Sequence, residues 1–143
     1  MQSRRRTPGY GFGMSENLEL VKAGFDAFNR DGVEGILPFI HPEFESTTPA
    51  NLAAEPDTYS GHDGVRRYFD SFYEVMEDIR WDAHSFQEVG DRVVVEFTLR
   101  ARGKSTGLDF GQDAAQVWEF RDGKAIGLEL YPTLDEALAA AGA

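Results

Sequence analysis

The chain has 143 residues, a length that suits one domain, and 41% of them are hydrophobic, enough for a substantial core. It contains no cysteine, which excludes disulfides, thiolate nucleophiles and cysteine-ligated zinc. The formal net charge of −11 predicts repulsion of phosphate backbones, so we expect no nucleic-acid partner. No apolar run has the length of a membrane span, and the arginines at positions 4–6 are not followed by an apolar stretch. We therefore expect no membrane association and a cytoplasmic location.

Residues 1–13 predict a flexible N-terminal tail, because glycine, proline and arginine recur there without apolar periodicity. Met14 resembles a second initiator, and Ser15 is expected to cap the first helix. The remaining residues, 14–143, are predicted to form a single domain.

The first half of that domain is mostly helical in pattern. Apolar residues at helical spacing predict helices over residues 16–31 and 33–39, and a third helix that begins at Gly61. Residues 43–47 can form a strand, and residues 50–60 are predicted to form a loop.

The second half is predicted to form two hairpins that turn at Gly90-Asp91 and at Asp122-Gly123. Alternation of apolar and polar residues predicts strands over residues 79–89, 92–104, 108–121 and 124–131. Thr133 is expected to cap a last helix over residues 134–141. Helices followed by strands indicate an α+β fold, with the helices on one face of a curved sheet.

Four segments resemble the SnoaL-like, or ketosteroid-isomerase-like, superfamily, which shares its fold with nuclear transport factor two. They are FIHPEFE at residues 39–45, YSGHDGVRRYF at 59–69, GDRVVV at 90–95 and VWEFRDGK at 117–124. The resemblance covers about residues 15–138 and implies a cone-like, curved antiparallel sheet wrapped around an N-terminal helical lid, a cystatin-like α+β barrel. It also implies a cavity at the open end of the cone. The family includes isomerases, cyclases, dehydratases, epoxide hydrolases and non-catalytic binders, so the resemblance does not choose a reaction.

Alternation and helical spacing select candidate ligand-binding residues for this cavity. Aromatic side chains supply apolar contact, and a few polar groups fix orientation. Gln116 lies between Ala114 and Trp118 on one strand face, where it either lines the cavity or belongs to a satisfied core network. The candidates are Gln116, Trp118, Tyr59, Tyr131, Ser46, Thr48, Phe28, Phe69 and Phe72.

Candidate catalytic residues are Glu45, Glu129 and His41. The resemblance places the isomerase base where this chain has Thr48, whose hydroxyl cannot abstract a proton near neutral pH unaided. Glu45 would face the cavity only after a bulge, and Glu129 only if the Tyr131 face points inward; otherwise both are surface charges. His41 is expected at the cavity mouth, where it could act as a general base.

The three histidines show no metal-ligand spacing and no glycine-rich phosphate loop is present, so we predict neither a metal nor a cofactor. Two functions stay open. One is proton-transfer chemistry of the isomerase, cyclase or hydrolase type on a hydrophobic small molecule, and the other is non-catalytic binding or dimeric assembly. A homodimer is predicted through the outer sheet face around Glu96, Arg100, Arg102 and Val117, with Val94 also on that face.

Overall fold

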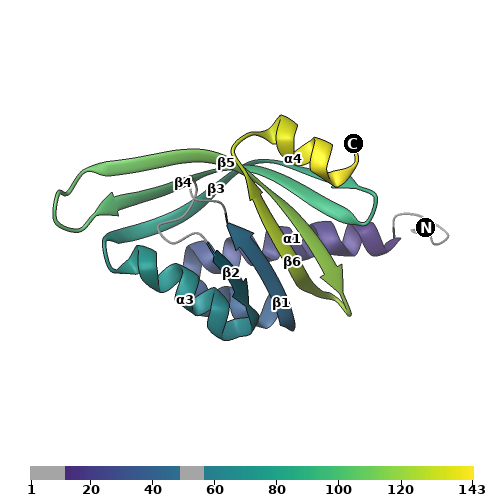
Figure 1. The fold of residues 1–143 in the computed structure, drawn as a ribbon, viewed down its shortest axis with the longest axis horizontal. Coiled ribbons are helices and arrows are strands. Elements are labelled where there is room, and N and C mark those ends of the chain that lie inside the picture. The colour runs from purple at the N-terminus through teal and green to yellow at the C-terminus, as the bar shows by residue number, and fades with distance from the viewer. Residues whose placement is uncertain (1–11, 49–56) are drawn as a thin grey trace.

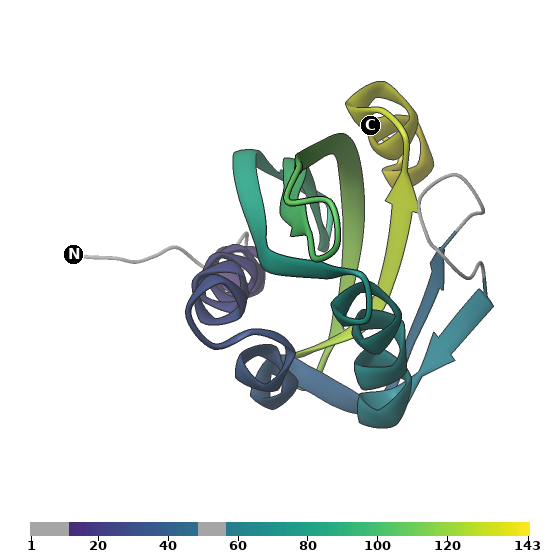
Figure 2. The same cartoon turned by 90° about the vertical axis from the view of Figure 1, so that its left-hand side faces the viewer.

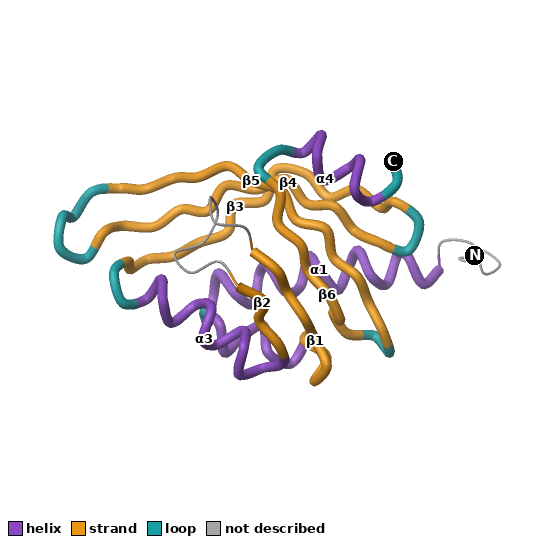
Figure 3. The backbone as a smooth tube through the Cα atoms, in the orientation of Figure 1, coloured by secondary structure: helices purple, strands orange, loops and turns teal. Residues whose placement is uncertain are grey.

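The computed structural model describes residues 12–48 and 57–143, which form helices packed on a curved six-stranded sheet (Figure 1). The helices are α1 (Phe12–Asp31), α2 (Val33–Ile36), the 3-10 helix η2 (Leu37–Phe39), α3 (Gly61–Tyr73) and α4 (Leu134–Ala141). The strands are β1 (Ile40–Thr48), β2 (Asp57–Ser60), β3 (Met76–Val89), β4 (Arg92–Gly103), β5 (Asp109–Arg121) and β6 (Lys124–Tyr131), drawn in orange in Figure 3. No helix in these two ranges is long and apolar enough to cross a membrane.

The strands follow the order β2-β1-β6-β5-β4-β3, and the sheet does not close into a full barrel. Neighbouring strands are antiparallel except β1 and β6, which pair in parallel, so the expected antiparallel sheet is in fact mixed. The sheet curls around α1 and α3 on its concave side, whereas α4 covers part of the outer side (Figure 2). The α+β fold with a helical lid is confirmed.

The predicted β5–β6 hairpin is present, and its turn has the expected chemistry. Asp122 and Gly123 both adopt positive φ, 54° and 74°, as a two-residue type I′ turn requires. The bounds of β6 and α4 agree with the sequence prediction. The Thr133 cap is also present, since its Oγ1 accepts a hydrogen bond from the Glu136 backbone N–H at 3.2 Å.

Other boundaries differ from the predictions for physical reasons. Helix α1 already begins at Phe12, so Ser15 lies inside it and does not cap it. Strand β2 occupies the end of the predicted loop, because its four residues are too few for a periodic signal and its order comes from pairing with β1. Residues 1–11, which hold most of the predicted tail, lie outside the described ranges.

The core between α1 and the sheet is strongly aromatic. The Phe28 ring stacks on the Trp81 indole with centroids 4.4 Å apart, and the Phe25 ring lies 5.0 Å from the same indole. Phe69 of α3 contacts both Phe28 and Trp81, at 4.9 and 5.7 Å. Burial of these large rings supplies much of the apolar stabilisation of the lid.

A polar contact fixes where this lid meets the sheet. Asn29 of α1 donates from Nδ2 to the Trp81 carbonyl oxygen at 2.9 Å and accepts from the Trp81 backbone N–H at 2.8 Å. Strand β3 is an edge strand, and the Asn29 amide pairs with its backbone as a neighbouring strand would. The contact lies just after an irregularity of β3 between Glu77 and Arg80. The contact therefore fixes the position of α1 along β3 and the position of Trp81 relative to the helix.

The outer face of the sheet carries a second apolar cluster under α4. Ala137 and Ala141 of the helix are buried against Val94, Ala115 and Val117. The two valines that suggested an exposed dimer surface are thus covered within the chain. What remains uncovered of the predicted dimer surface is an outer strip of charged residues, Glu96, Arg100 and Arg102, on β4.

We expect Asn29→Asp to lower the free energy of unfolding by about 1–3 kcal/mol. The carboxylate keeps the acceptor for the Trp81 N–H but loses the donor, and it faces the Trp81 carbonyl oxygen unpaired. Urea unfolding followed by circular dichroism measures the change.

Asn17→Asp is the matched control, because Asn17 of α1 also donates to a carbonyl, that of Asp91, but through one exposed 3.4 Å hydrogen bond. This control should change stability by less than about 0.5 kcal/mol. Equal effects of the two substitutions would contradict the special role of the Asn29 pairing.

Candidate functional site

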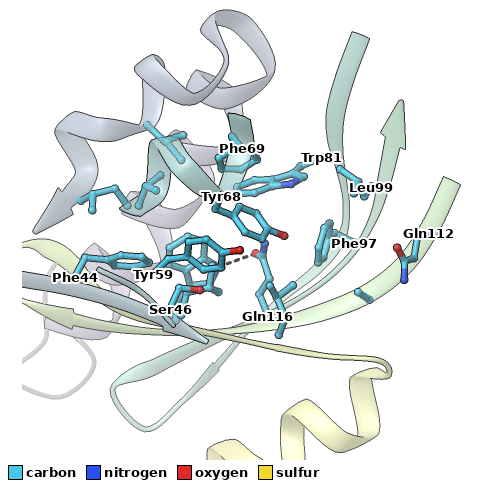
Figure 4. A pocket seen from close by; sticks show the side chains of 17 residues that line it. Phe44, Ser46, Tyr59, Tyr68, Phe69, Trp81, Phe97, Leu99, Gln112 and Gln116 are labelled. Carbon is cyan, nitrogen blue, oxygen red and sulfur yellow. Dashed lines mark hydrogen bonds between the residues drawn. The ribbon is translucent and has the colours of Figure 1, made fainter. Parts of the chain in front are cut away.

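A hollow lies between the helical lid and the concave face of the sheet (Figure 4). Its cavity volume is about 50 Å³, which is more than one water molecule needs. Its lining comes from every described strand and from α2 and α3, namely Ile36, Ile40, Phe44, Ser46, Tyr59, Val65, Tyr68, Phe69, Trp81, Phe97, Leu99, Gln112, Ala114, Gln116, Trp118, Leu128 and Leu130.

Strand β5 forms the floor of this pocket through simple alternation. Gln112, Ala114, Gln116 and Trp118 all point inward, as the sequence predicts. Ala114 lies opposite Phe97 of β4, and its small side chain leaves open volume beside the larger ones. The period of two therefore places two amides and an indole in one row.

Gln116 and Trp118 are joined by a hydrogen bond inside the pocket. The indole Nε1–H donates to Gln116 Oε1 at 2.8 Å, and Gln116 is only 1% exposed. Figure 4 shows the Gln116 side chain among the rings of Tyr59, Tyr68 and Trp81. The two readings of Gln116 from the sequence are thus combined, since it lines the pocket and also takes part in a buried hydrogen bond.

The other polar lining groups are hydroxyls and a second amide. They come from Ser46, Tyr59, Tyr68 and Gln112, of which the last three have further interactions within the chain. None of the lining residues in the described ranges is Asp, Glu, His, Lys or Arg. Such a lining can hold and orient an apolar molecule by hydrogen bonds, but it offers no side chain that exchanges protons readily near neutral pH.

Five of the predicted ligand-binding residues are brought together here: Ser46, Tyr59, Phe69, Gln116 and Trp118. Phe28 and Phe72 lie one layer behind, where Phe28 stacks on Trp81 and the Phe72 ring lies 5.3 Å from Tyr68. Tyr131 belongs to the outer cluster beneath α4 and not to this pocket. Thr48 ends β1, and its side chain lies outside what the structure describes.

The three candidate catalytic residues lie away from the pocket. Glu45 is exposed at the β1–β2 pairing, opposite Ser60. Glu129 is exposed on the outer face and accepts a hydrogen bond from the Tyr131 hydroxyl at 2.9 Å. Their assignment as bases depended on inward orientation, which neither side chain has.

His41 is held at the β5–β6 turn and not at the pocket mouth. Its Nδ1 accepts from the Glu43 backbone N–H at 2.9 Å, and its Nε2 lies 3.7 Å from Asp122 Oδ2. Ile40, its neighbour, takes the inward position in β1. Within the described ranges, no group of three or more His, Asp or Glu residues could hold a metal ion.

Sequence reasoning missed Trp81 and Tyr68 as lining residues. Tyr68 lies three residues after Val65, so helical spacing could have placed it on the inward stripe. Trp81 alternates with Ile79 and Ala83, which are separated from it by the polar residues Arg80 and Asp82, so the period of a strand could have placed it on the inward face.

Comparisons with known proteins agree with this architecture. The family model described as "SnoaL-like domain" matches residues 21–127. An NTF2-like protein of unknown function from Burkholderia pseudomallei is 26% identical, covering 91% of this chain and 100% of its own, with a TM-score of 0.73. TerC, co-crystallised with polyporic acid, is 28% identical over 90% of this chain and 99% of its own, with a TM-score of 0.72. An NTF2-like protein from Burkholderia xenovorans is 27% identical over 90% and 97%, with a TM-score of 0.67. A search of curated proteins found no match.

We expect stability to fall between about pH 10 and pH 12 through Tyr131. Burial and the Glu129 hydrogen bond raise the pKa of Tyr131 from 10.0 to about 12. Above about pH 10 the unfolded chain loses this proton while the folded chain keeps it, so rising pH favours unfolding. The melting temperature should therefore fall more between about pH 9 and pH 11 in the wild type than in Tyr131→Phe.

Glu129→Gln tests the contribution of the neighbour. It keeps the tyrosine but removes the carboxylate that helps to raise the pKa of Tyr131. The fall in melting temperature between the two pH values should therefore be smaller than in the wild type. Identical pH dependence in all three proteins would refute this account.

Proposed function

Because this chain belongs to the SnoaL-like domain family, we propose that it binds a hydrophobic, ring-bearing small molecule in the pocket above β5. The observation that carries the proposal is the lining, in which aromatic walls surround a few neutral hydrogen-bonding groups. Burial of rings against rings supplies affinity, and the amides and hydroxyls select orientation.

The comparison with TerC supports this proposal. That protein was crystallised with polyporic acid, and it matches 90% of this chain at 28% identity. We extend to this chain only the class of function, the binding of an organic small molecule by the same fold.

An enzymatic function by proton transfer has less support. Each of Glu45, Glu129 and His41 lies outside the pocket, and the described lining carries neutral groups alone. A general base must come within hydrogen-bond reach of the proton that it removes. Binding without acid–base catalysis by these three residues is therefore the function that we propose.

We expect Ala114→Leu to weaken binding of the neutral fluorescent probe N-phenyl-1-naphthylamine at least about ten-fold. Ala114 is 5% exposed and borders the open volume, so the added carbons occupy space that a ligand needs. Titration of probe fluorescence measures the dissociation constant.

Gln87→Leu adds a leucine on the exposed side of β3, outside the pocket, and should leave probe binding within about two-fold. Melting temperatures of both variants check that each still folds. Unchanged probe binding by Ala114→Leu would overturn the proposed pocket.

We also propose a homodimer formed by the outer strip defined above. Its arginines form ion pairs with acids of β3, Arg100 with Asp82 and Arg102 with Asp78, so positive and negative groups alternate on one surface. Such a surface can be self-complementary about a two-fold axis. Sedimentation velocity at tens of micromolar should show a dimer.

Arg100→Ser should weaken this dimer about ten-fold, and Arg121→Ser, which removes another exposed and ion-paired arginine outside the strip, should not. A monomer at every concentration would end the proposal.

A further inference from the structure

The Gln116 amide has a single orientation that its chemistry fixes. An indole N–H only donates hydrogen bonds, so the amide atom 2.8 Å from Trp118 Nε1 must be the oxygen. The amide nitrogen consequently points away from Trp118. Rotating the amide by 180° would set two N–H donors against each other.

Within residues 12–48 and 57–143, no group accepts a hydrogen bond from the other end of this amide. Trp118 is the one hydrogen-bond partner of the Gln116 side chain among the described residues. Among the described residues, Ser85 Oγ is the one fully enclosed side-chain polar atom that has no hydrogen-bond partner. The Gln116 nitrogen has no partner either, so it is not fully enclosed, and it borders the open volume of the pocket. An amide nitrogen that carries two N–H donors, on a residue only 1% exposed, thus borders the space where a ligand would lie.

We propose that Gln116 is the recognition point for a carbonyl oxygen, and that the ligand class is an aromatic ketone or quinone. The inference rests on the proposed function, because it assigns the polar contact made in the same pocket. The oxygen of Gln116 is already engaged, so the group offered to a ligand is a donor, and its complement is an acceptor.

The surroundings favour a neutral acceptor over a charged one. The described lining has no cation to pair with a carboxylate, and the formal net charge of −11 repels anions. Aromatic rings on several sides exclude water, and this strengthens a hydrogen bond from the amide to a ligand carbonyl. Beside a ligand without a carbonyl, the amide N–H groups would be left without a hydrogen-bond partner.

Two bicyclic probes of nearly equal shape test this assignment: 1-indanone carries a carbonyl, and indane replaces it with a methylene. Displacement of N-phenyl-1-naphthylamine gives both dissociation constants. We expect wild-type protein to bind 1-indanone about ten-fold more tightly than indane, beyond the difference in their solubility, which octanol–water partitioning corrects. The infrared carbonyl stretch of bound 1-indanone should lie at lower frequency than that of 1-indanone in an apolar solvent, because the bound carbonyl oxygen accepts a hydrogen bond.

Gln116→Met keeps the length of the side chain and removes the donors. The variant should lose both the preference for 1-indanone over indane and the infrared shift, and its melting temperature checks that it still folds. Trp118→Phe leaves Gln116 in place but frees its amide to rotate, so the preference should fall to about three-fold or less.

The outcomes separate the two proposals. Equal corrected affinities for 1-indanone and indane in wild type, or an unchanged infrared shift in Gln116→Met, would overturn the role of Gln116 and leave the pocket standing. Failure of both probes to displace the fluorophore would overturn the proposed function, and this inference with it.

Discussion

The pairing of the Asn29 amide with the backbone of Trp81 is the contact on which the arrangement of the lid depends. It satisfies the backbone N–H and C=O of Trp81 on the free edge of β3 and fixes the position of α1 against the sheet. The Phe25, Phe28 and Phe69 rings then gather on the Trp81 indole, whose other surface forms a wall of the pocket. One amide thus links the packing of the core with the shape of the site.

The chemistry of the site follows from a division between the two faces of the sheet. Acidic and basic residues such as Glu129, Arg100 and Asp82 lie outside, where ion pairs and water stabilise them. The concave face keeps neutral donors and acceptors among aromatic rings, because an unpaired charge there would lose its hydration. The division suits recognition of an uncharged molecule by shape and a few hydrogen bonds.

The sequence alone predicts much of this, and its errors have physical causes. Alternation in β5 correctly places Gln116 and Trp118 on one inward face, because that strand is regular. Alternation alone does not reveal which face of β6 is inward. The position of α4 decides that, and it puts Tyr131 outside. The parallel pairing of β1 with β6 joins residues far apart in the chain, so no local sequence pattern predicts it.

That partnership has a consequence for how the chain acquires its shape. Strand β6 lies between β1 and β5, so a segment that is synthesised after the other five strands becomes an inner strand of the sheet. Until it arrives, β1 and β2 have no neighbour that joins them to the hairpins, and the hollow lacks one side. Folding of the sheet therefore depends on contacts between residues that are far apart in the chain. Such contacts slow folding and leave strand edges exposed on the nascent chain.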